Sequence, residues 1–178
     1  MKNKAQTTTE QMLIVLHILA WLALVGLLIE AGAILISYGI SYTNPEGAKN
    51  LYNGLNLYDL RQLNFWYYTG AVSYLVVLSI LKLLVTIQVI KILSKFNLKN
   101  PFTLEVARRL EKISYIALGT WVVTMLSNIY TGWLQKTTGK LYGSQLSGEF
   151  IFMVGLVFVI AQVFKRGVEI QSENDLTV

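Results

Sequence analysis

The chain of 178 residues contains no cysteine, one histidine and two prolines, and charged residues make up only 14% of it. The absence of cysteine excludes disulfides, thiolate metal sites and a cysteine nucleophile. With His17 as the single histidine, one chain cannot build a multi-histidine metal site. A soluble domain carries about 25% charged residues, so the low charge indicates a chain whose surroundings are largely apolar.

Four long apolar stretches explain the low fraction of charged residues. A helix rises about 1.5 Å per residue and the hydrocarbon layer is roughly 30 Å thick, so about 20 apolar residues cross it. The fourth stretch is short, and the preceding polar residues complete it at the interface. We expect an all-α membrane protein with one four-helix domain over residues 1–178 and spans at about 12–36, 65–90, 113–134 and 147–165.

Lysine and arginine are distributed unevenly among the segments outside these spans. Ten lie in the two termini and the 91–112 connection, against four in the other two connections. The positive-inside rule therefore predicts that both termini, the 91–112 connection and the 166–178 tail are cytoplasmic. The net charge of +5 is then explained by the orientation of the chain in the membrane. The expected partner of these basic residues is the lipid bilayer with its anionic headgroups. Direct binding of nucleic acid is not expected.

The predicted cytoplasmic connection contains a helix start at Asn100-Pro101-Phe102-Thr103. Proline suits the first turn of a helix, and Asn100 can act as the N-cap. Beyond it, apolar residues lie on one face and Arg108, Arg109, Glu111 and Lys112 lie largely on the other. This pattern predicts a short amphipathic segment near the lipid surface that leads into the third span.

The last span is followed by the basic residues Lys165 and Arg166, by Gly167 as a bend or C-cap, and then by an acidic tail. One interpretation of the tail is a frayed terminus. The alternative is an extended docking strand, since apolar and polar residues alternate in parts of it. Together with the helix start, the tail supplies the candidate residues for docking a partner: Asn100, Pro101, Phe102, Thr103, Arg108, Arg109, Glu173, Asp175, Leu176, Thr177 and Val178.

Polar residues inside the expected spans are the second group of candidates, because exposing them to lipid is costly. They are His17, Glu30, Lys82, Asn128 and Gln162. Small residues at steps of three or four, such as Ala23, Gly26 and Ala33, share a face with Glu30. Ordinary helix packing explains such faces better than a transport path does.

Glu30 and Lys82 are the natural candidates for an intramembrane ion pair. Counted from the expected cytoplasmic boundaries, however, Glu30 lies about 28 Å deep and Lys82 about 14 Å deep. We therefore expect Glu30 near the outer interface and Lys82 extending toward the cytoplasm, with direct pairing as the alternative. His17 is expected to hydrogen-bond a neighbour, with a proton-sensing contact to Lys82 as the alternative.

The connection 42–64 is rich in Asn, Gly, Tyr and Leu, and we expect it to be ordered at the outer surface. Its aromatic residues and their neighbours, including Trp66 and Tyr68, together with Trp133 and Tyr142 around the other outer connection, suit the headgroup layer. A ligand-binding loop is the functional alternative for 42–64. Catalytic motifs are missing from the sequence, since it has no phosphate loop and no HExxH pattern. We expect no enzymatic activity, cofactor or metal.

Three sequence elements resemble a family of bacterial four-helix membrane proteins called domain of unknown function family 2975. They are the segments Lys99–Thr103 and Arg109–Ile113, and the end of the chain from Phe164-Lys165-Arg166-Gly167 through Val178. The resemblance implies a multi-pass protein of the bacterial inner membrane without assigned catalytic residues. It also implies a cytoplasmic partner, because many members are encoded beside a Cro/C1-type helix-turn-helix regulator.

Two hypotheses of function follow. In the first, the chain is a non-enzymatic regulatory or sensory membrane partner of such a regulator, with the docking residues at its cytoplasmic edge. In the second, it is a small four-helix transporter or permeability element that acts as a homo-oligomer and uses Glu30 and Lys82.

Overall fold

The computed structural model describes residues 8–96, 98, 101–140, 142 and 149–175, and their regular structure is entirely helical. The helices are α1 (Thr8–Thr43), the short 3-10 helix η1 (Pro45–Lys49), α2 (Tyr58–Leu63), α3 (Phe65–Lys95), α4 (Leu104–Thr138) and α5 (Glu149–Asp175). Within the described residues, α1, α3 and α4 are each long and apolar enough to cross a membrane, consistent with a multi-pass membrane protein. The fourth predicted span corresponds to α5, which is not among these three.

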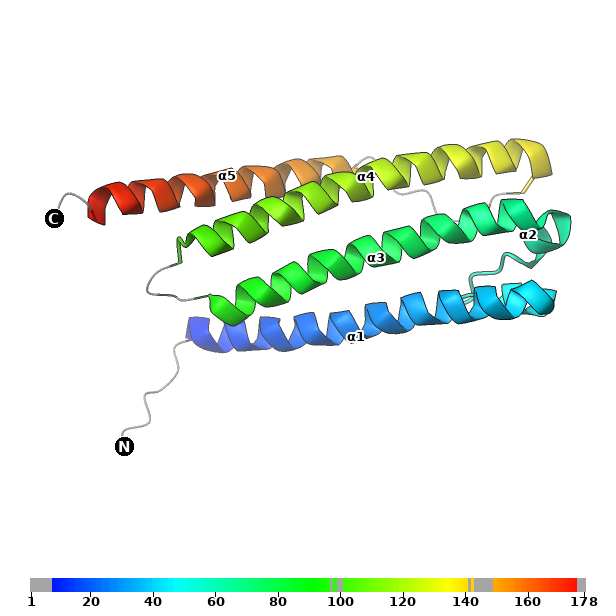
Figure 1. Ribbon diagram of the computed structural model, residues 1–178, viewed down its shortest axis with the longest axis horizontal. Coiled ribbons are helices and arrows are strands. Elements are labelled where there is room, and N and C mark those ends of the chain that lie inside the picture. The colour runs from blue at the N-terminus through cyan, green and yellow to red at the C-terminus, as the bar shows by residue number, and fades with distance from the viewer. Residues whose placement is uncertain (1–7, 97, 99–100, 141, 143–148, 176–178) are drawn as a thin grey trace, which may run out of the picture.

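The four long helices lie side by side in chain order, as Figure 1 shows. In the described part of the chain, α1 packs on α3, α3 on α4 and α4 on α5, whereas α1 does not pack on α4 or α5. The result is a row with α1 and α5 at its two edges. A closed four-helix bundle differs from this row because its first and last helices also meet.

The two ends of the row differ in character. The start of α1, the connection between α3 and α4, and the end of α5 lie together at one end (Figure 1). We call it the basic end, because the end of α3, the first turns of α4 and the last part of α5 carry Lys91, Lys95, Arg109 and Arg166. The opposite end carries η1 and α2, and we call it the cap end. The start of α1, the end of α5 and the connection between α3 and α4 thus share one end, as the positions of the basic residues predicted.

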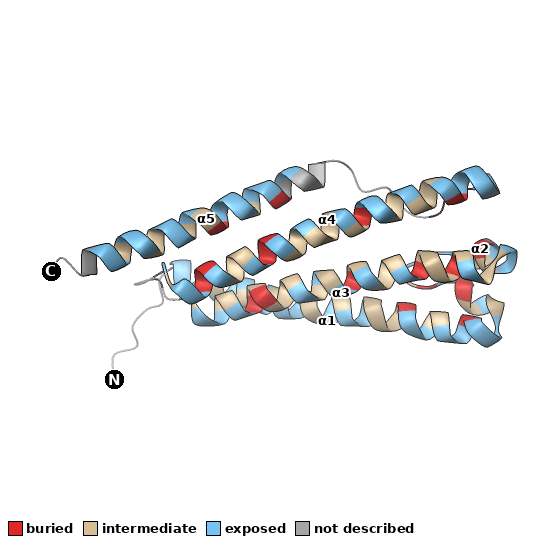
Figure 2. Ribbon diagram, turned by 45° about the horizontal axis from the view of Figure 1, so that its top comes forward, coloured by how far each residue is buried: buried red, intermediate tan, exposed pale blue. Residues whose placement is uncertain are grey.

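The cap end holds most of the fully buried apolar residues (Figure 2). They include Ile34, Ala48, Leu51, Leu60 and Tyr68, which come from α1, η1, α2, α3 and the segments between them. The connection 42–64 is therefore an ordered structure, as predicted. Its approach to α1 is close: a Cβ atom added at Gly47 would lie 2.8 Å from the backbone nitrogen of Ser41.

This burial corrects the headgroup assignment for two aromatic residues. Tyr68 is completely buried, and its hydroxyl accepts a hydrogen bond of 2.9 Å from Ser41. Tyr142 also belongs to the buried cluster. In contrast, Trp66 is 76% exposed, as a headgroup anchor requires. The cap needs large side chains for its own core, and composition alone does not separate these from anchoring residues.

The α1 helix buries little of its surface, and most of its Leu, Ile and Val side chains are exposed in the single chain. An exposed apolar surface of this extent is consistent with a helix that crosses a membrane. Its packing face toward α3 includes Leu27, Glu30 and Ile34, which are half-buried or buried. Ala23 and Gly26 are exposed, so the small-residue face predicted for α1 is only partly its packing face.

Candidate functional site at the basic end

The connection between α3 and α4 differs from the prediction at its helix start. Thr103 caps α4, since its side chain accepts a hydrogen bond of 3.3 Å from the backbone N–H of Val106. Asn100, the predicted cap, lies outside the described residues. α4 then runs unbroken to Thr138. The predicted amphipathic segment is thus the first part of one long helix, because nothing in residues 104–113 interrupts the helical hydrogen bonds.

Phe102 attaches this connection to α5. Its ring lies 5.2 Å from the ring of Phe164, measured between centroids. It also covers Gly167, where an added Cβ atom would lie 2.6 Å from Cδ1 of Phe102. The sequence suggested a bend or a C-cap at Gly167, and this was wrong. Gly167 lies inside α5, at the point where the ring of Phe102 packs closely against the helix. We call Phe102, Phe164 and Gly167 the elbow contact.

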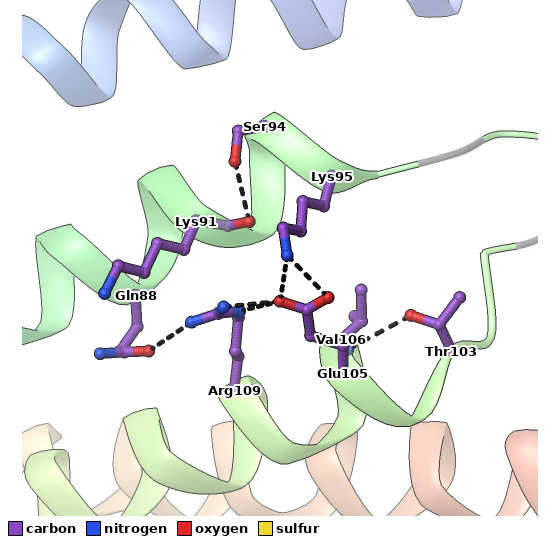
Figure 3. Close-up of polar contacts among 8 residues, drawn as sticks. All are labelled: Gln88, Lys91, Ser94, Lys95, Thr103, Glu105, Val106 and Arg109. Atoms are coloured by element: carbon purple, nitrogen blue, oxygen red, sulfur yellow. Dashed lines mark hydrogen bonds and ion pairs between the residues drawn. The ribbon is translucent and has the colours of Figure 1, made fainter.

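A polar cluster beside the elbow contact joins α3 to α4 (Figure 3). The Glu105 carboxylate accepts hydrogen bonds from Lys95 Nζ at 2.9 Å and from Arg109 Nη2 at 2.6 Å. Arg109 Nη1 donates a third bond, of 3.3 Å, to Oε1 of Gln88, a residue that is only 5% exposed. One carboxylate and one arginine therefore fix the end of α3 to the first turns of α4.

The structure brings several of the predicted docking residues together and leaves others apart. Phe102, Thr103 and Arg109 take part in the contacts at the connection, and Arg108 is exposed beside Arg109. Pro101 precedes Phe102 in the segment 101–103, which has no regular secondary structure. Sequence reasoning did not select Gln88, Lys95 and Glu105. A polar amide within an apolar helix was the available signal for Gln88.

The tail after Gly167 is helical, which contradicts the extended docking strand and the frayed terminus up to Asp175. Arg166 Nη1 lies 2.8 Å from Glu169 Oε2, and this hydrogen bond raises the pKa of Arg166. Glu173 is exposed on the last turns of α5. The (i, i+3) spacing of Arg166 and Glu169 favours a helix over a strand. The candidates Leu176, Thr177 and Val178 lie outside the described residues.

Glu30 and Lys82 form an ion pair, contrary to the depths expected for them. Lys82 Nζ lies 3.0 Å from Glu30 Oε1, and the hydroxyl of Ser79 donates to the same oxygen at 3.4 Å. The expectation was wrong because it assumed that both helices begin at the same depth. Contacts at the cap end, such as the Ser41–Tyr68 hydrogen bond, set the register and bring the two residues level.

A cavity of about 450 Å³ lies next to this pair and is lined by residues of all four long helices. Its lining is apolar apart from Lys82, Thr86 and Thr120. The hydroxyls of both threonines donate to carbonyls of their own helices. Lys82 is the charged residue of the lining, and its ammonium is paired with Glu30.

The other polar residues of the spans have local roles. His17 Nε2 accepts a hydrogen bond of 2.9 Å from Trp21 Nε1, so His17 contacts a neighbour on its own helix, as expected. The backbone carbonyl of Asn128 accepts from Thr131 at 3.1 Å. Gln162 is half-buried between α4 and α5, where it lines a cavity of about 210 Å³.

A sequence model of one protein family matches residues 43–178, a region that contains the elbow contact, the polar cluster and α5. The chain belongs to the family described as "Protein of unknown function (DUF2975)". The region matched to DUF2975 includes Lys82 but not Glu30, since it begins at the last residue of α1. No curated protein and no solved structure matches the chain.

Proposed function

We propose that this chain is a non-enzymatic membrane protein that binds a cytoplasmic regulator of the Cro/C1 helix-turn-helix type at its basic end. In this proposal α5 is the fourth span, and the basic end faces the cytoplasm of a bacterial cell across the inner membrane. The excess of lysine and arginine in the segments at this end supports that orientation.

The observation that carries the proposal is the continuation of α5 past the elbow contact. Gly167 lies under Phe102 at the level of the connection, and α5 continues to Asp175. These last eight residues correspond to about 12 Å of helix. Figure 1 shows the end of α5 reaching beyond the end of α3 and the start of α4. We call residues Val168–Asp175 the α5 extension.

The composition of the α5 extension suits a basic partner. It contains Glu169, Glu173 and Asp175 and no lysine or arginine. Ile170 is 47% exposed and offers an apolar contact among these acids. Proteins that bind nucleic acid carry clustered positive charge, and complementary charge speeds and orients association. The elbow contact holds the extension in a fixed place, which lowers the entropic cost of binding.

Affinity capture from detergent-solubilised membranes tests this proposal. The full chain is compared with a chain that lacks Ser172–Val178, at equal levels of membrane insertion. We expect a helix-turn-helix protein to be recovered with the full chain only. Recovery of that protein with both chains, or of identical chains alone, would contradict the proposal.

A second candidate function is transport by a homo-oligomer. The observation in its favour is the Glu30–Lys82 pair beside a cavity lined by four helices. Intramembrane ionisable residues mark ion and substrate paths in many transporters. Under this alternative, Glu30→Gln and Lys82→Met abolish proton-coupled flux in reconstituted vesicles. Absence of any flux with the unmodified chain would remove this candidate.

A further inference from the structure

The end of α3 and the first turns of α4 line an open pocket of about 510 Å³ at the basic end. Four of the residues that line it are cationic: Lys91, Arg108, Arg109 and Lys112. The pocket has one acidic lining residue, Glu105. The lining of this open pocket therefore carries an excess of positive charge.

The single carboxylate does not neutralise this excess. Glu105 is already paired with Lys95 and Arg109. Among the described residues, no acid forms an ion pair with Lys91, Arg108 or Lys112. Positive charges that face one another without a counter-charge repel, so an anion in the pocket would stabilise the end of the row.

A buried amide supplies a further donor. Gln88 is 5% exposed, and Arg109 orients it by donating to its Oε1 atom. The Oε1 atom of Gln88 is thus engaged by Arg109, and its NH₂ group donates no side-chain hydrogen bond within the described part of the chain and is available to a ligand in the pocket. Figure 3 shows the Lys91 side chain running toward the Gln88 amide. Both residues line the pocket, where an anionic oxygen would accept from each.

The position of the pocket identifies the source of the anion. Lys91 directly follows the apolar stretch 65–90, and Lys112 directly precedes the apolar stretch 113–134. The pocket thus lies where the hydrocarbon layer gives way to the headgroups, and the exposed Leu104 forms part of its lining. A membrane lipid presents its phosphate at this level with its acyl chains beside α3 and α4.

We propose that this pocket binds the phosphate group of an anionic membrane lipid. Arginine and lysine supply charge-assisted hydrogen bonds to the phosphate oxygens, and the NH₂ group of Gln88 donates another. The site is independent of the proposed regulator, since neither the tail nor the elbow contact lines it.

Lipid binding to the full-length chain in detergent tests the site, with native mass spectrometry and phosphatidylglycerol as the probe. The variant Lys91→Gln/Arg108→Gln removes two lining charges. We expect it to bind the probe roughly 10- to 30-fold more weakly, at about three- to fivefold for each cation removed. The matched control Lys165→Gln/Arg166→Gln removes the same charge at the same end, outside this pocket, and is expected to bind with unchanged affinity.

Two further arms complete the experiment. Gln88→Glu keeps an acceptor for Arg109 and adds a negative charge, so we expect weaker binding with the fold retained. Inorganic phosphate at millimolar concentration is expected not to displace phosphatidylglycerol. Equal weakening in the two double variants would show diffuse surface charge and overturn the site. Displacement by inorganic phosphate would assign the pocket to a soluble ligand and overturn the lipid.

Discussion

The ring of Phe102 covers Gly167, so closely that an added Cβ atom on residue 167 would lie 2.6 Å from Cδ1 of the ring. Phe102 belongs to the connection between α3 and α4, and Gly167 belongs to α5. The contact therefore joins two segments that are far apart in the sequence. It fixes the point from which the α5 extension leaves the row of helices.

Substitution of Gly167 by alanine is expected to displace Phe102. Gly155→Ala is the matched control, since it lies on the same helix and an added Cβ atom there meets nothing within 4 Å. Both variants gain helix propensity, so their difference isolates the clash. We expect Gly167→Ala to be less stable than Gly155→Ala by about 1–2 kcal/mol, measured by unfolding in detergent. Adding Phe102→Ala should remove this difference; a difference that persists would contradict the contact.

Two adjacent arginines are expected to differ sharply in their effect on stability. Arg109→Met leaves the nearly buried Gln88 without its donor, which we expect to cost about 1–3 kcal/mol. Arg108→Met changes an exposed neighbour that lies beside the same cluster, and should change stability by about 0.5 kcal/mol or less. Chemical denaturation of the two variants measures the contrast. Equal values would show that the polar cluster does not hold α3 against α4.

The cap end behaves as a packed core in this account. Leu60 is completely buried and Leu63, on the same short helix α2, is 58% exposed. Leu60→Ala is expected to destabilise the cap by about 2–5 kcal/mol, and to expose residues 44–64 to protease. Leu63→Ala should leave the protease pattern unchanged. Rapid cleavage of the unmodified chain within 44–64 would contradict a packed cap.

The ion pair between α1 and α3 predicts a non-additive double variant. Lys82→Met leaves Glu30 in the span without its partner, at a cost of roughly 2 kcal/mol or more. Glu30→Gln leaves the Lys82 ammonium unpaired in the same way. The double variant Glu30→Gln/Lys82→Met is expected to recover part of the loss, as measured in a double-mutant cycle of unfolding free energies. Additive losses would mean that the two residues do not interact.

The long helices could be predicted from the sequence because length and apolar composition determine them locally. The expectation of spans held for α1, α3 and α4, and the positions of Lys and Arg predicted which connections share one end. Depth could not be obtained in the same way. Glu30 and Lys82 are level because contacts at the cap end set the register of α1 against α3, and those contacts join residues far apart in the sequence.

The site was predictable only in part, for a related reason. The motif residues Phe102 and Gly167 stood out in the sequence, but their contact depends on how α5 packs against α4. The tail was taken for a strand or a frayed end because alternation was visible in it. The tail is helical up to Asp175 because it continues α5. Extending an existing helix costs less free energy than starting a new one.

The most direct test of the central claim is the location of the helix-turn-helix regulator in cells that contain this chain. Its membrane-bound fraction is compared for the unmodified chain, the chain without Ser172–Val178, Glu173→Lys in the α5 extension, and the matched charge change Glu10→Lys at the start of α1. We expect the regulator in the membrane fraction with the unmodified chain and Glu10→Lys, and in the soluble fraction with the other two. A regulator that stays soluble in every case, or stays at the membrane without the tail, would contradict the account.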